Sequence, residues 1–152
     1  MNADYRQRVI MHEDFDHAME EMREALSAEG MQTIAHTDLR ERFRETLGHD
    51  WHDLRRCELV EAWAPYPALH AYERDPDAEA LLPASFVVAE LANGETAVTA
   101  SEPLSWMQWH PRLRRTAPGL VAFAADQEAH VAHVMARLDH TPTTVGRRLA
   151  AA

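Results

Sequence analysis

The hydrophobic pattern predicts a β-hairpin in the middle of the chain. Residues 86–88 (FVV) form an apolar run of β-branched and aromatic residues, and residues 96–99 (TAVT) resume strand character after Asn93 and Gly94. An Asn-Gly pair is typical of a two-residue type I′ turn, in which both residues have positive φ. A hairpin is too small to form a core alone, so we expect helices on either side to pack on its apolar face.

Helical spacing of apolar residues dominates the first third of the chain. Such residues recur at intervals of three and four from Phe15 to Leu26, with Asp14 placed to cap the helix and Gly30 to end it. A shorter helix is predicted between Asp38 and Gly48 by the same signals. Strands are predicted at residues 5–12, 31–37 and 57–63, and we expect the first two to pair with each other.

The later segments complete an α+β pattern. Pro67 is placed to begin a short helix after the third strand, and a long helix is predicted from Thr116, with apolar residues along one side as far as Leu138. Turn formers and small residues follow this helix. We therefore expect residues 1–140 to form a single α+β domain and residues 141–152 to form a flexible C-terminal tail.

The amino-acid composition and net charge of the chain exclude several classes of protein. The chain has 152 residues, of which 46% are hydrophobic, which is enough for one domain with a sizeable core. Its 25 acidic and 15 basic residues leave a net charge of -10, which argues against nucleic acid or an anionic membrane as the main partner. The absence of lysine excludes Schiff-base chemistry and a P-loop. The single cysteine, Cys57, and the lack of a long apolar run predict a cytoplasmic protein.

Four segments together resemble an uncharacterised family, domain of unknown function family 302. They are FDHAMEEMREALSAEGM, TDLRERFRETLG, CELVEAWAPYPALHAYERDPDAEALLP and ASFVVAELANGETAVTASEP, so the resemblance covers roughly residues 5–105. It implies an antiparallel sheet with helices packed on one side, similar to the TATA-binding-protein-like arrangement, and it implies a homodimer. Because the family's activity is unknown, the resemblance implies no reaction and no cofactor.

Large amphipathic rings cluster near the end of the third strand and in the helix that follows. They are Trp63, Tyr66, His70 and Tyr72. Rings of this kind, apolar in body and polar at one point, are typical of small-molecule pockets. We therefore predict a module that binds a small molecule or cofactor between the sheet and this helix, and the sequence does not identify the ligand.

Two histidine pairs keep a metal-assisted hydrolase as the alternative. His49 and His52 lie with two aspartates in GHDWHDL, but a mononuclear zinc site needs ligands from a second segment, and none is evident. His130 and His133 are three residues apart, whereas the zincin motif has two histidines four apart with a glutamate directly after the first. The sequence therefore assigns neither a metal ligand nor a catalytic residue.

An aromatic segment stands out within the acidic chain. In LSWMQWHPRLRR, Trp106, Met107 and Trp109 precede Arg112 and two further arginines. Aromatic residues, methionine and arginine are enriched at protein interfaces, although a loop that closes one end of the core would have the same composition. We predict that the segment contributes to a homodimer interface, because a two-fold contact covers the same apolar patch twice.

Overall fold

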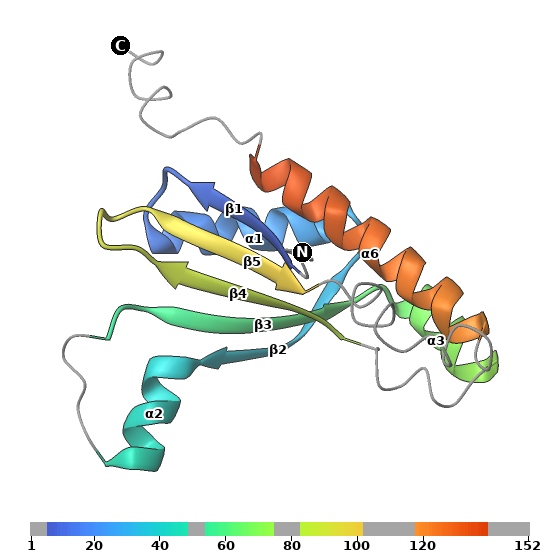
Figure 1. Ribbon diagram of the computed structural model, residues 1–152, viewed down its shortest axis with the longest axis horizontal. Helices are drawn as coiled ribbons and strands as arrows, with labels where there is room; N and C mark the ends of the chain where they lie inside the picture. The colour runs from blue at the N-terminus through green and yellow to red at the C-terminus, as the bar shows by residue number, and fades with distance from the viewer. Residues whose placement is uncertain (1–5, 49–53, 75–82, 102–117, 140–152) are drawn as a thin grey trace, which may run out of the picture.

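The computed structural model describes residues 6–48, 54–74, 83–101 and 118–139. These residues form a five-stranded sheet and four helices (Figure 1). In chain order the elements are β1 (Arg6–Met11), α1 (Phe15–Ala28), β2 (Gln32–Asp38), α2 (Leu39–Leu47), β3 (Cys57–Trp63), α3 (Pro65–Arg74), β4 (Ala84–Glu90), β5 (Thr96–Ser101) and α6 (Pro118–Asp139). The predicted α+β class, with a long C-terminal helix, is confirmed.

The strands lie in the order β1-β5-β4-β3-β2, and all neighbours are antiparallel. The prediction that the first two strands pair is wrong, because β1 pairs with β5 and β2 pairs with β3 at the opposite edge. Because all neighbouring strands are antiparallel, β1 and β2 run in the same direction, and α1 is the crossover helix that two parallel strands need between them.

The core lies between the helices α1 and α6 and one face of the sheet. Burial alternates along β3 and β4, so that Val60 and Phe86 are buried whereas Leu59 and Val87 on the opposite face are only half-buried. The apolar stripe of α1 and the buried side of α6 complete the core: Phe15, Met19, Met22, Leu26, Val131, Val134 and Leu138. The buried side chains of β3 and β4 therefore fall at every second residue, which is the period expected for a strand with one buried face.

The connection between β4 and β5 is a three-residue loop, Ala92–Gly94, and the predicted two-residue type I′ turn is wrong. The Gly94 N–H donates to the Leu91 carbonyl (3.1 Å), and the Leu91 N–H donates to the Glu95 carbonyl (2.8 Å). Gly94 has a φ of 82°, but Asn93 does not have positive φ, and its side-chain oxygen accepts from the Glu95 N–H (3.2 Å). A type I turn followed by a left-handed glycine has this pattern.

The predicted caps are present at the ends of α1 and α2. Carboxylate oxygens of Asp14 and Asp38 each accept a hydrogen bond from a backbone N–H three residues later, at 3.0 Å in both cases. Gly48 ends α2 in the left-handed conformation, with a φ of 67°. The third helix differs from its prediction, because it begins at Pro65 rather than Pro67. Both prolines fit the first turn, where the N–H groups have no partner within the helix.

The helix α6 is the longest described helix, with 22 residues. Its buried side includes Leu120 and Phe123 near the beginning and Leu138 near the end. The exposed side carries Asp126, His133, Arg137 and Asp139 together with several alanines. In the described ranges, neither α6 nor any other helix has the length and apolar character needed to cross a membrane.

Candidate functional site

A hollow of about 460 Å³ lies between α3 and α6. This volume falls within the range of roughly 300–1,000 Å³ that is usual for small-molecule sites. One side of each helix forms the described lining: Tyr66, Pro67, His70, Ala71 and Arg74 from α3, and Gly119, Ala122, Phe123 and Asp126 from α6. The hollow is therefore built by two helices that are separated in the sequence by β4 and β5.

Helical periodicity explains why these side chains converge. Tyr66, His70 and Arg74 are spaced by four residues, which places them on one side of α3. Gly119, Ala122 and Asp126 are spaced by three and four residues, which places them on one side of α6. The floor is apolar, since Phe123 is buried with 8% of its surface exposed, whereas Tyr66 at the rim is 81% exposed.

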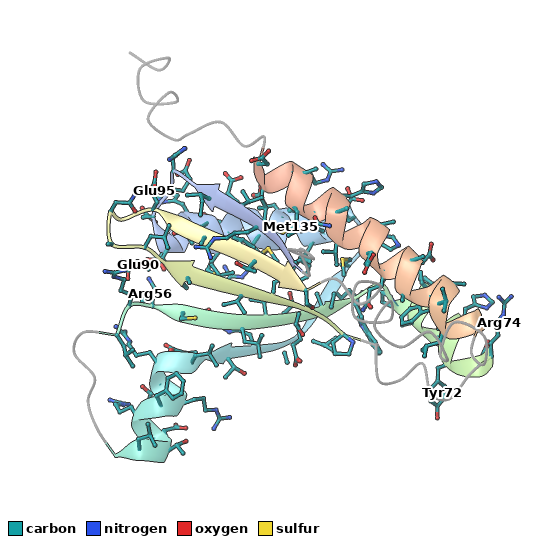
Figure 2. The ribbon with its side chains drawn as sticks, in the orientation of Figure 1. Arg56, Tyr72, Arg74, Glu90, Glu95 and Met135 are labelled. Carbon is teal, nitrogen blue, oxygen red and sulfur yellow. The ribbon has the colours of Figure 1, made fainter. Side chains whose placement is uncertain are left out.

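Two opposite charges face this hollow from different helices. Arg74 is the last residue of α3 and lies beside the N-terminal end of α6 (Figure 2), and Asp126 lies two turns into α6. Both side chains are exposed, and neither forms an ion pair with the other or with any other residue in the described ranges. The hollow thus contains a cation and an anion that have no ion-pair partner within the described part of the chain, as well as the Tyr66 hydroxyl and the His70 imidazole.

Two of the four residues predicted to bind a ligand line the hollow. Tyr66 and His70 do so, but Trp63 is part of β3, where it pairs with Gln32, and Tyr72 points away from α6 (Figure 2). The hollow also lies between two helices, whereas the prediction placed the site between the sheet and the helix after the third strand. Sequence reasoning missed Arg74, although its spacing of four from His70 was visible.

A second, much smaller space adjoins the inner end of the hollow. It measures about 10 Å³ and is lined by Met31, Ala64, Pro67, Phe123, Gln127 and His130. A space of this size holds about one water molecule. Because Pro67 and Phe123 border both spaces, these two side chains form the inner wall of the hollow.

The histidines of α6 have different neighbours. His130 lines the small inner space, whereas His133 Nδ1 lies 3.3 Å from Glu29 Oε2 at the end of α1. Arg137 Nε donates to the other oxygen of Glu29 at 2.6 Å, and this hydrogen bond is the main reason why the pKa of Glu29 is below its ordinary value. The side of α6 that carries His133 therefore joins α6 to α1.

The described ranges contain no group of three or more His, Cys, Asp or Glu side chains that could hold a metal ion. The candidate metal residues His49 and His52 lie outside the described residues. So do all four residues of the predicted dimer interface: Trp106, Met107, Trp109 and Arg112.

Cys57 is a half-buried free cysteine at the start of β3. Burial raises the pKa of its thiol, and the nearby carboxylates of Asp38 and Glu58 raise it further. A raised pKa keeps the thiol protonated at neutral pH, and the protonated form is a poor nucleophile. Cys57 is therefore not an activated thiol.

Most of the chain matches the model of a known family, described as "Domain of unknown function DUF302", over residues 7–138. The chain belongs to the DUF302 family. The DUF302 match extends beyond the resemblance visible in the sequence, which ended near residue 105, and it includes all of α6 except its last residue. A search among curated proteins found no match.

A solved DUF302 structure has a similar fold. The "crystal structure of uncharacterized conserved protein DUF302 from Bacillus stearothermophilus" matches with a TM-score of 0.73 and 21% sequence identity. The match covers 89% of this chain and 98% of that chain. Membership of the DUF302 family accounts for the sheet and its helices. A shared fold does not assign a function, so the role of the hollow has to be inferred from the residues that line it.

Proposed function

We propose that this DUF302 protein is a binding module that takes a small organic molecule into the hollow between α3 and α6. The observation that carries the proposal is the meeting of polar groups from two helices above an apolar floor. Tyr66, His70 and Arg74 face Asp126 across the hollow, with Phe123 beneath. A few convergent polar groups on apolar walls are the usual composition of a ligand site.

Binding is favoured over catalysis by the residues in the lining. The described lining contains no Ser, Thr, Cys or Lys side chain, so it lacks the hydroxyl, thiol or amine that a neighbouring base such as His70 commonly activates as a nucleophile. The apolar floor instead suits an aliphatic or aromatic part of a ligand, and the rim suits its polar groups. The metal-assisted hydrolase has no observation in its favour among the described residues.

Filling the hollow should abolish ligand binding. Replacing Ala122 with Trp places a large ring in the lining, whereas Ala125→Trp changes an exposed residue of the same helix that is not in the described lining. We expect fragments from a library of charged and neutral aromatic compounds to shift amide NMR signals of α3 and α6 in the wild type and in Ala125→Trp. The same fragments should have no effect on Ala122→Trp. Fragments that bind Ala122→Trp as well as the wild type would contradict the proposal.

We further propose that the protein is a homodimer. Two surfaces support self-association. No residue of α2 is buried, and its apolar side exposes Phe43 (49%) and Leu47 (56%). In addition, Leu59 and Val87 lie on the sheet face opposite α1 and α6 and are only half-buried. Exposed apolar side chains that lie together on one side of an element favour a contact with a partner, and a second copy of the chain is the simplest partner.

The predicted interface segment supplies the test of the dimer. We expect the wild type to scatter light as a particle of about 35 kDa, twice the chain mass of 17.3 kDa. The double variant Trp106→Ala with Trp109→Ala should shift toward the monomer. Phe43→Ser with Leu47→Ser is the comparison, because a monomer in that variant alone would place the interface on α2. A wild type that is monomeric at micromolar concentration would contradict the dimer.

A further inference from the structure

We infer that the ligand of the hollow is a small zwitterion with an apolar body, in the size range of an amino acid. This inference rests on the proposed function, because it assigns a chemical class to the ligand of the same hollow. An anionic group of the ligand would meet Arg74, a cationic group would meet Asp126, and the apolar body would lie over Phe123.

The two charges that line the hollow are the first argument. Some arginines of the protein reach carboxylates, as Arg56 does with Asp16 (2.8 Å), Arg137 with Glu29 (2.6 Å) and Arg42 with Glu45 (3.2 Å), whereas Arg23 and Arg55 have no carboxylate partner among the described residues. Arg74 and Asp126 face the same hollow and have no such partner among the described residues. A zwitterion supplies one complementary charge to each, and a carboxylate matches the two-pronged geometry of a guanidinium.

The positions of the two charges set the length of the ligand. Arg74 lies beside the N-terminal end of α6, where Gly119 contributes to the lining (Figure 2). Asp126 lies seven residues farther along α6, which corresponds to about 10 Å along the helix axis. A ligand that meets both ends of this stretch therefore extends about 10 Å at most along α6, which is the size range of an amino acid with a side group.

The same charges argue against other classes of ligand. A phosphate ester or a nucleotide carries at least two negative charges, but the described lining offers Arg74 as its only arginine and places Asp126 opposite. Repulsion by Asp126 therefore disfavours such dianions, and Arg74 disfavours polyamines by the same reasoning. The apolar floor of Pro67, Ala71, Ala122 and Phe123 favours a zwitterion that has a hydrophobic side group.

Three probes that each carry a phenyl ring separate the contributions of the carboxylate and the ammonium group to binding. L-phenylalanine carries both charges, 3-phenylpropanoate lacks the ammonium, and 2-phenylethylamine lacks the carboxylate. By isothermal titration calorimetry we expect L-phenylalanine to bind the wild type about tenfold more tightly than either analogue, as one charge-assisted hydrogen bond allows. Arg74→Gln should remove the advantage over 2-phenylethylamine, and Asp126→Asn should remove the advantage over 3-phenylpropanoate.

Two controls distinguish failure of this inference from failure of the proposed function. Arg23→Gln changes an exposed arginine on α1 and should leave all three affinities unchanged. If an analogue binds as tightly as L-phenylalanine, or if none of the three binds, the zwitterion assignment is overturned. The proposed function survives that result if other fragments still bind the wild type and fail to bind Ala122→Trp. Binding of L-phenylalanine that is unaffected by Ala122→Trp would place its site elsewhere and would overturn both.

Discussion

Replacing Phe86 with alanine is expected to lower the free energy of unfolding by about 3–5 kcal/mol. Phe86 lies in β4, the central strand of the sheet, and its side chain is completely buried between the sheet and the helices α1 and α6. The substitution removes an aromatic ring from a closely packed core, and rigid neighbours cannot fill the space. Equilibrium denaturation in urea, followed by circular dichroism, measures the change.

The neighbouring residue supplies a matched control for this prediction. Val87 is in the same strand but faces the opposite side, where it is half-buried. Val87→Ala should therefore cost only about 1 kcal/mol. Similar losses for both variants would show that the second face is also covered in the folded protein, which would point to this face as part of the dimer contact. A Phe86→Ala variant of nearly wild-type stability would contradict the assignment of the core face.

Replacing Gly94 with valine is expected to lower the free energy of unfolding by about 1–3 kcal/mol. Gly94 has a φ of 82°, a conformation that a β-branched residue adopts only with strain. No atom lies within 4 Å of the position that a Cβ would occupy. The expected loss therefore comes from the backbone conformation and not from a collision, and thermal or urea denaturation measures it.

An asparagine at position 94 distinguishes backbone strain from a steric collision as the cause of the expected loss of stability. Asparagine tolerates the left-handed conformation better than other residues with a side chain, so Gly94→Asn should lose less stability than Gly94→Val. Equal losses in the two variants would indicate a steric cause instead. An unchanged melting temperature for Gly94→Val would contradict the three-residue loop with a left-handed glycine.

The candidate site was partly visible in the sequence. Tyr66 and His70 were singled out by their rings and their place after the third strand, and Arg74 follows His70 at the same spacing of four that separates Tyr66 from His70 on α3. Tyr72 is six residues after Tyr66, which corresponds to roughly 600° of helical rotation and therefore to a different side of the helix. The contribution of α6 was not visible, because Asp126 resembles any exposed acidic residue until α3 is placed opposite it.

The sequence by itself determined the features that depend on residues close to one another along the chain. Caps at Asp14 and Asp38 and a left-handed glycine at Gly48 satisfy backbone groups within one or two turns, so local chemistry specifies the helix ends. Alternation along β3 and β4 likewise specifies which side chains enter the core. Only the tertiary structure decided the pairing of β1 with β5, the form of the Asn-Gly turn and the approach of α3 to α6. These features depend on contacts between segments that are distant in the sequence, or on strand register, and several arrangements satisfy the same local pattern.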